Sequence, residues 1–366
     1  MTNELLYQVA LTLIPNIGPV QAKILLQHCE AEEIFHAKKH FLEKIEGIGP
    51  VRAASITSFN DFCKAEEEIK FIEKYKIKPL FLSDVAYPKR LLTCYDSPTL
   101  LYYKGEADLN SSRMIAIIGT RSNTDYAKHI TDKLVKELAE HNVTIVSGLA
   151  FGVDALAHKA SVKNNVPTIG VLAHGLDQIY PSEHSSLAKD MIKSGGGLLT
   201  EFRNKTKPDK HNFPSRNRIV AGMCDATIVV ETSLKGGSMI TAELANGYNK
   251  DVFACPGKIT DSKSTGCNLL IKHNKASLLS EAQDLILAMG WADTKKTKNK
   301  RQKELFIELT TEEKIILAVL GEKESVHIDE INIKSGLNSS AVAAAILNLE
   351  LQNVIVSLPG KLYKLE

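Results

Sequence analysis

Runs of apolar residues divide the chain into segments with different periods. Between residues 114 and 254, short continuous apolar runs alternate with longer amphipathic stretches; the runs cover 114–118, 144–146, 168–172, 197–200, 227–230 and 252–254. Such runs are typical of strands buried on both faces, and helices over 126–140 and 154–163 fit between them. The alternation predicts an α/β core: a Rossmann-like, doubly wound, mostly parallel sheet.

The segment before this core is predicted to be helical over residues 1–75. Two stretches that begin at Leu13 and Ile45 share an apolar residue, a Gly-Pro turn and a following helix, the pattern of a helix-hairpin-helix motif in a SAM-like domain. Such a turn either presents amide N–H groups to a phosphate or only joins two packed helices, and both interpretations stay open. Residues 76–290 form the core domain together with connector strands near 79–83, 87–92 and 100–105, whose prolines favour sheet edges.

The last segment, residues 310–366, is predicted to be a small winged-helix domain. Its first helix is expected from Thr310 or Thr311 through Gly321, and its second over 328–335. The third runs from Asn338 or Ser339 to about Gln352, and a hairpin of two strands, 354–357 and 362–365, follows. The third helix contains no Lys or Arg, and the segment holds eight acids against five bases, which favours a protein contact over a grip on DNA. Residues 291–309 are predicted to be a basic, solvated linker, with transient phosphate contact as the alternative.

Composition and charge narrow the class of protein. The chain has 366 residues and a formal charge of only +2, so any affinity for nucleic acid must come from local clusters of charge. Its six cysteines show no C-x-x-C spacing, which is typical of reduced thiols rather than of disulfides or a zinc site. The N-terminal stretch has no signal-peptide pattern and no apolar run reaches about 18 residues, so we expect a cytoplasmic protein with no membrane partner.

The most distinctive stretch is His-Asn-Phe-Pro-Ser-Arg-Asn-Arg at 211–218, preceded by Lys210. Base stacking on Phe213, with phosphate capture by cations around it, is the chemistry of single-stranded nucleic-acid binding. The alternative is a surface loop whose Phe fills the core and whose Arg residues pair with carboxylates. The candidate binding residues here are Lys210, Phe213, Arg216, Asn217 and Arg218.

Two further loops follow predicted strands, where a doubly wound sheet holds its ligand. Gly119, Thr120 and Arg121 come directly after the first core strand, and Arg121 offers a bidentate fork for phosphate. Gly236, Gly237 and Ser238 open a helix after residues 227–230, which predicts an anion site or, alternatively, a simple helix N-cap. Neither G-x-G-x-x-G nor G-x-x-x-x-G-K-[ST] occurs, so we expect no nicotinamide, flavin or other cofactor.

Asp154 and His158 stand at i and i+4 on a predicted helix. They form either an acid/base or metal pair, or a structural cap with an interior hydrogen-bond network. The structural interpretation is favoured because no third metal ligand and no nucleophile stands at a spacing typical of a metal or catalytic site.

Taken in order, these motifs resemble the DprA/Smf family of DNA-processing proteins. The shared motifs are Gly119-Thr-Arg, Ser147-Gly-Leu-Ala-x-Gly-Val-Asp, Gly175-Leu-Asp-x-x-Tyr-Pro, Phe213-Pro-x-Arg-Asn-Arg-Ile, Gly236-Gly-Ser-Met-Ile-Thr-Ala and Pro256-Gly. The resemblance implies a non-enzymatic protein that binds single-stranded DNA, forms a homodimer through its Rossmann-like core, and protects incoming DNA and loads the RecA recombinase in natural transformation.

By the same resemblance, Arg121 is a phosphate-binding residue, Lys210 and Phe213 are the family's lysine and stacking aromatic, and Gly236–Ser238 is a second phosphate loop. The chain departs from the family's usual pattern at Thr120, at Phe151 where Arg is frequent, and at His273–Ala276 where Gly-Ala is usual.

An enzymatic alternative remains open. The Gly-Gly-x-x-Thr loop followed by Glu243 also resembles phosphoribohydrolases of the lysine-decarboxylase-like fold, in which Arg121 and Glu243 would bind a nucleoside monophosphate. A structural adaptor with a vestigial pocket is a third possibility.

Overall fold

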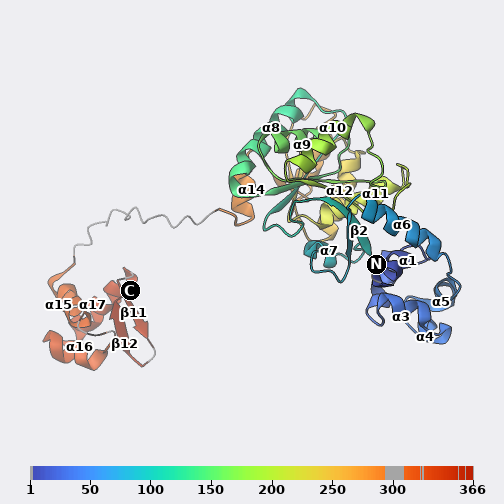
Figure 1. Cartoon of the computed structure of the whole chain (residues 1–366). Coiled ribbons are helices and arrows are strands. Elements are labelled where there is room, and N and C mark those ends of the chain that lie inside the picture. Colours follow the sequence, from blue (N-terminus) through green and yellow to red (C-terminus); the bar gives the residue numbers. More distant parts are fainter. Residues whose placement is uncertain are drawn as a thin grey trace. The chain divides into compact units, whose positions relative to one another are not determined.

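The computed structural model describes residues 3–292, 309–321, 323, 325–352, 354–358 and 360–365. The chain forms two compact units that divide after Ala292, and each is described by itself (Figure 1). The predicted basic linker therefore lies almost wholly outside the described residues.

The first unit is built around a sheet that has nine strands within the described residues, in the order β1-β2-β6-β5-β4-β3-β7-β8-β9. Strands β3 to β9 pair in parallel with their neighbours, whereas β1 and β2 add an antiparallel edge beside β6. The predicted Rossmann-like, mostly parallel core is confirmed. The strands are β1 Lys78–Phe81, β2 Leu100–Gly105, β3 Met114–Ile118, β4 Thr144–Ser147, β5 Thr168–Val171, β6 Gly197–Thr200, β7 Ala226–Val229, β8 Asp251–Ala254 and β9 Ser277–Leu278.

Helices cover both faces of this sheet. Along β3, Met114, Ala116 and Ile118 join the apolar cluster of one face while Ile115 and Ile117 join that of the other, as a doubly covered strand requires. One face carries α8 Asp125–Leu138, α9 Val153–Lys163, α10 Ser185–Lys193 and α14 Ala282–Ala288. The other carries α7 Lys89–Leu92, α11 Asn212–Gly222, α12 Gly237–Gly247 and α13 Thr265–Lys272; short 3₁₀ turns occur at Ala139–His141 and Ser182–His184.

One predicted connector strand is wrong. Residues 89–92 form the helix α7, not an edge strand. Pro88 precedes the first turn, and Leu91, only 1% exposed, packs into the same cluster as Ile219 of α11. Tertiary packing therefore outweighs the extended preference that the proline suggested.

The N-terminal helices share a core with the edge of the sheet. Both predicted Gly-Pro segments open helices, with Pro19 starting α2 and Gly49 starting α5. Their apolar cluster also includes Phe81 of β1 and Leu100 and Tyr102 of β2. The helices are α1 Asn3–Leu11, α2 Pro19–Leu26, α3 Ala31–His36, α4 Lys39–Glu43, α5 Gly49–Thr57 and α6 Phe62–Lys74.

Polar contacts join the same two regions. Lys23 Nζ donates to the carbonyl oxygen of Leu92 at 2.8 Å, and the buried carboxylate of Glu68 accepts the backbone and side-chain N–H groups of Asn204. Arg52, the cation nearest the second Gly-Pro turn, donates to Asn16 O and Gly47 O. That use of Arg52 favours the structural interpretation of the turn.

The second unit has the predicted winged-helix arrangement. The helices are α15 Thr311–Leu320, α16 Ile328–Ser335 and α17 Ser339–Leu351, and the strands are β10 Val326–His327, β11 Ile355–Leu358 and β12 Leu362–Leu365 in the order β10-β12-β11. Thr310 and Asn338 cap α15 and α17 by accepting the amides of Glu313 and Ala341. The sequence did not predict β10, a two-residue strand that pairs with β12.

Within the described residues, no helix combines the length and apolarity needed to cross a bilayer. The six cysteines, all of which lie in this part of the chain, are unpaired, and no three His, Cys, Asp or Glu side chains there are grouped as a metal site.

The Asp154–His158 pair belongs to the interior hydrogen-bond network, as the structural alternative predicted. Asp154 Oδ2 accepts the amides of Gly148 at 3.1 Å and Ala150 at 3.4 Å, whereas His158 Nδ1 contacts Thr168 Oγ1 at 2.7 Å. His158 is fully buried, and this burial lowers its pKa to about 3. The imidazole is therefore neutral in the fold.

This buried imidazole predicts a loss of stability in mild acid. A histidine in an unfolded chain has a pKa of about 6.5, so below that pH the unfolded state binds a proton that His158 does not bind in the folded state. This proton binding at His158 has almost no effect on stability above pH 7, and it lowers the free energy of unfolding by about 2 kcal/mol at pH 5. Urea unfolding at pH 7 and pH 5 measures it, and His158→Gln is expected to remove that part of the difference.

His129, exposed on α8, supplies the matched control, because His129→Gln makes the same change of side chain without removing a buried imidazole. Burial also lowers the pKa of His174, so a residual acid sensitivity persists in both variants. Equal pH dependence in His158→Gln and the parent protein would contradict the prediction.

Candidate functional site

The site lies where the order of the strands reverses. From β3 the chain proceeds outward through β4, β5 and β6, then returns to place β7 on the other side of β3. The loops after β3 and β7 therefore leave in opposite directions and open a crevice at the carboxyl ends of the strands. A pocket of about 1230 Å³ occupies this place, lined from the segments 118–121, 148–154, 178–183, 207–220 and 236–241.

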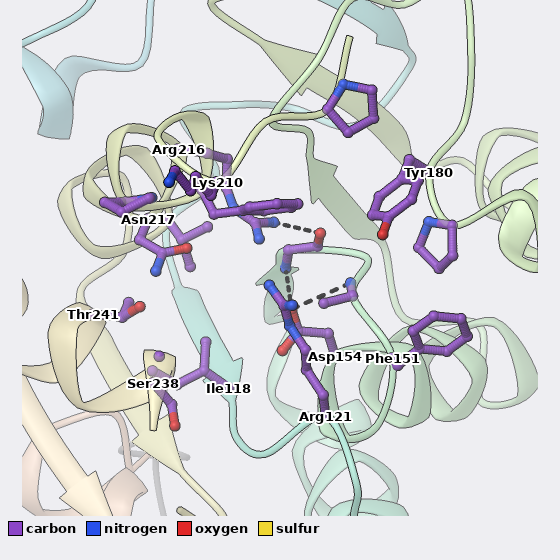
Figure 2. A pocket seen from close by; sticks show the side chains of 18 of the residues that line it. Ile118, Arg121, Phe151, Asp154, Tyr180, Lys210, Arg216, Asn217, Ser238 and Thr241 are labelled. Atoms are coloured by element: carbon purple, nitrogen blue, oxygen red, sulfur yellow. Dashed lines mark hydrogen bonds between the residues drawn. The ribbon is translucent and has the colours of Figure 1, made fainter. Parts of the chain in front are cut away.

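Most of the predicted site residues meet in this pocket, although they come from three separate segments of the chain: the loop after β3, the start of α11 with the residues before it, and the start of α12. The lining includes Gly119, Thr120, Arg121, Lys210, Phe213, Arg216, Asn217, Gly236, Gly237 and Ser238. Figure 2 shows Arg121 between two walls, with Ser238 and Thr241 on one side and Tyr180 and Phe151 on the other.

Arg218 is a correction to the predicted set, because it does not line the pocket. Its guanidinium forms an ion pair with Glu201 Oε2 and donates to the carbonyl oxygen of Asp96. Residues two positions apart on a helix point to different sides, so α11 turns Arg218 away from Arg216. Arg218 is thus one of the arginines that pair with carboxylates, as the alternative interpretation of the octamer stated.

Arg216 lines the pocket but is itself buried, with 4% exposure. Its Nη1 donates to the carbonyl oxygens of Val171, at 2.7 Å, and of Gly148. Asp154 supplies the countercharge: burial raises the pKa of this carboxyl above its usual value, and the guanidinium of Arg216 opposes part of that rise. A Cβ at Gly148 would lie 1.9 Å from the guanidinium, so glycine is required there. Arg216 holds the loops together and does not extend as a free phosphate ligand.

Phe213 and Arg121 form a cation–π pair at the mouth of the pocket. The guanidinium carbon of Arg121 lies 4.9 Å from the centroid of the Phe213 ring. Arg121 is exposed and Phe213 is partly exposed, and Lys210 stands exposed one turn before Phe213. The ring and two accessible cations therefore line the same pocket.

The start of α12 supplies backbone donors. Gly236 is the N-cap and Gly237 and Ser238 are the first helical residues, whose amides have no acceptor inside the helix. The amide of Gly236 donates to Ser233 O, and Ser238 Oγ donates to Thr232 Oγ1 at 2.7 Å. The groups available to an anion are thus the amides of Gly237 and Ser238, aided by the helix dipole.

Glu231, which the sequence analysis missed, fixes the loop after β3. Its buried carboxylate accepts the amide of Thr124 at 3.0 Å and Thr124 Oγ1 at 2.6 Å, and its carbonyl accepts the amide of Thr120 at 2.7 Å. Gly119 serves packing rather than ligand approach, because a Cβ there would lie 2.5 Å from Val153 Cγ2. The sequence signal that pointed to Glu231 was its position as an acidic residue directly after the apolar run 227–230.

The enzymatic alternative loses one of its two proposed residues. Glu243 does not line the pocket, and its carboxylate pairs with Lys275 at 2.7 Å on the protein surface. Among the carboxylates that do line the pocket, Asp154 is committed to backbone amides.

The charges around the pocket nearly balance. The exposed cations that line it are Arg121, Lys207 and Lys210, and the exposed acids are Glu183 and Asp209. Asp209 Oδ1 also accepts the amide of His211, the residue that precedes α11, at 2.8 Å. Aromatic and backbone contacts must therefore carry a large share of any binding.

Together, the fold and the pocket define a Rossmann-like protein whose pocket presents exposed cations, aromatic rings and the amides of a helix start. The profile of the family described as DNA recombination-mediator protein A matches residues 78–290, and that of the DprA winged helix domain matches residues 304–361. The chain belongs to the DprA/Smf family of DNA-processing proteins.

Relatives and solved structures agree with this placement. The chain is 32% identical to protein Smf of Synechocystis over 99% of both chains, and 41% identical to the DNA processing protein DprA of Bacillus subtilis over 57% of this chain and 70% of that protein. It resembles the crystal structure of Streptococcus pneumoniae DprA with a TM-score of 0.65 and 32% identity, covering 79% of this chain and 98% of that one. A Helicobacter pylori DprA structure, described as revealing a single-stranded DNA binding mode, matches with a TM-score of 0.53 and 32% identity over 59% and 97% of the two chains.

The structural role of Arg216 leads to a stability prediction. Arg216→Met leaves two carbonyls unsatisfied and removes the cation beside buried Asp154, so the free energy of unfolding falls by about 3–5 kcal/mol. Arg121→Met, at an exposed position, changes it by less than about 1 kcal/mol. Urea unfolding measures both. If Arg216→Met stayed stable and lost only ligand affinity, Arg216 would be a binding residue after all.

Proposed function

We propose that this protein binds single-stranded DNA in the pocket at the ends of β3 and β7. The observation that carries the proposal is the Phe213 ring with the Arg121 guanidinium stacked on it and Lys210 nearby. A base can stack on such a ring only when it is unpaired, and the cations hold the phosphates beside it. The similarity to the H. pylori protein supports the same ligand.

In this proposal each group has a separate task. Phe213 stacks a base, while Arg121, Lys207 and Lys210 contact phosphates from the exposed rim. The amides of Gly237 and Ser238 hold a phosphate at the helix start, and Asn217 contributes a polar side chain to the same wall. No catalytic residue and no cofactor is assigned.

The wider role proposed for the protein rests on its family. We infer that it acts in the cytoplasm, protects incoming DNA and loads RecA during natural transformation and recombination. A homodimer through the Rossmann-like core would join two pockets into one longer groove. Analytical ultracentrifugation, and the rate of RecA filament growth on coated single strands, test these points separately from DNA binding.

One prediction for DNA binding separates the contribution of base stacking from that of ionic contacts. Phe213→Ala is expected to weaken binding of oligothymidylate about 5- to 100-fold without changing the salt dependence, since one stacked base contributes about 1–3 kcal/mol. Arg121→Ala is expected to weaken binding and to reduce the slope of log K against log salt by about 0.7, the value of one single-strand phosphate contact. Fluorescence anisotropy over a salt series measures both.

Lys159, an exposed cation of α9 that does not line the pocket, provides the control: Lys159→Ala leaves affinity and slope unchanged. The parent protein should prefer single-stranded to duplex DNA at matched salt. Equal affinity for the two forms, or no effect of either pocket variant, would refute the proposed site.

The winged-helix unit leads to a second prediction. In α17, Leu347 and Leu351 are 56% and 74% exposed, and the helix carries no cation, so it offers little to a DNA backbone. Deleting residues 304–366 is therefore expected to leave single-strand affinity within about threefold of the full chain. The same anisotropy assay measures it, and a large loss with the first unit still folded would assign DNA contacts to the tail.

A further inference from the structure

The pocket has a second aromatic surface that the proposed function does not use. Phe151 follows β4 and is 43% exposed, and Tyr180 follows β5 and is 48% exposed. Both line the pocket. Single exposed aromatic side chains are common, but Phe151 and Tyr180 line the same pocket as Phe213, and grouped rings form an apolar surface on which a ligand can stack.

The loop that carries Phe151 is held in place rather than free. Leu149 is completely buried and adopts a left-handed φ of 53°, which is costly for a residue with a branched side chain. His184 Nδ1 contacts Leu149 O at 2.8 Å, and the His184 ring meets that of Phe151 edge-on at 5.1 Å. The fold accepts strain in this loop, and the edge-on contact with the buried His184 helps to position the Phe151 ring.

The three pocket rings are close neighbours but do not form a slot for one base. The centroids of Tyr180 and Phe213 are 6.3 Å apart and their planes are tilted by 47°. All three rings line one small cavity of about 30 Å³, the space of a single water molecule. A base must therefore stack on an outward face, and different rings serve different bases.

The opposite wall of the pocket has the complementary chemistry. Ser238 and Thr241 face Tyr180 and Phe151 across Arg121 (Figure 2). The wall at the start of α12 offers amides and a helix dipole to phosphate, whereas the other wall offers ring faces. A strand that passes between them has its backbone on one side and its bases on the other.

We propose that Phe151, supported by Tyr180, forms a second base-stacking position, so that the pocket holds two neighbouring nucleotides of one strand, with one base on Phe213 and the next on the Phe151–Tyr180 wall. This inference rests on the proposed binding of single-stranded DNA. The second stacking position adds affinity that does not depend on salt concentration, which suits a pocket whose accessible charges nearly balance.

The test uses the full-length protein, oligothymidylate, and an abasic oligomer that keeps the sugar and phosphate backbone but lacks bases. Phe151→Ala is expected to weaken binding of oligothymidylate about 5- to 100-fold with an unchanged salt slope, and to leave binding of the abasic oligomer unaltered. Tyr180→Leu is expected to act in the same direction. Phe41→Ala is the matched control, since Phe41 is also 43% exposed but lies on α4 and does not line this pocket.

A substitution that keeps the ring gives a direct signal. Phe151→Trp is expected to retain affinity, and its fluorescence is expected to be quenched by oligothymidylate but not by the abasic oligomer. The chain has one other tryptophan, Trp291, whose signal is measured in the parent protein. This variant also keeps the test valid if Phe151→Ala folds poorly.

The outcomes separate the two proposals. If Phe213→Ala loses affinity while Phe151→Ala does not, and Phe151→Trp is not quenched, the second stacking position is wrong and the proposed function stands. Equal weakening of both oligomers by Phe151→Ala also overturns it, because the ring would then act through the backbone or the loop. If the parent protein binds no single-stranded oligomer, the proposed function itself fails.

Discussion

The buried guanidinium of Arg216 is the contact on which the pocket depends. It joins α11 to the loop after β4, through Gly148 O, and to the end of β5, through Val171 O. A buried cation is destabilising unless it is paired and hydrogen-bonded. Here Nη1 carries both hydrogen bonds and Asp154 supplies the opposing charge, while the buried Nε has no hydrogen-bond partner among the described residues. Phe213 lies three residues earlier on the same helix, about one turn away, so the position of the ring follows from the anchoring of Arg216.

Anchoring of this kind explains why the buried side of the pocket is fixed by hydrogen bonds, whereas the side chains at its opening are free to change conformation. Arg216, Asp154 and Glu231 are buried and use their polar atoms on backbone groups of neighbouring loops. The groups at the mouth, including Arg121 and Lys210, are long side chains in contact with water. A ligand therefore meets a scaffold whose backbone amides and rings are preset and whose cations can adjust to the path of a flexible chain.

Several features of the fold were predictable because they are local. The buried strands appear as continuous apolar runs, and Thr310 and Asn338 mark helix starts by capping. Other features depend on pairings between distant residues. The assignment of Arg216 to the interior and of Arg218 to Glu201 follows from the rotation of α11 against the sheet, which the octamer alone does not specify.

The role of Glu231 is another non-local result. It becomes visible only once β7 is known to lie beside β3, which places its carboxylate against Thr124. The two residues of β10 form a strand only because β12, far later in the chain, offers its edge. The candidate site was thus predictable in its loops and residue types, but not in which side chains face the ligand.

The shared core of the N-terminal helices and the sheet has a consequence for how the chain folds during synthesis. The helical segment is made before the sheet, yet Leu100 and Tyr102, which complete its apolar core, come later in the chain. Asn204, which satisfies the buried carboxylate of Glu68, is 136 residues further along. Although N-terminal segments generally fold first on the ribosome, this one reaches its native packing only after β6 and the turn beyond it have emerged. The nascent helices therefore expose part of their apolar surface until β2 has been made, and the Glu68 carboxylate stays without Asn204 until β6 has followed. The first of these intervals is when the helices most need protection from aggregation.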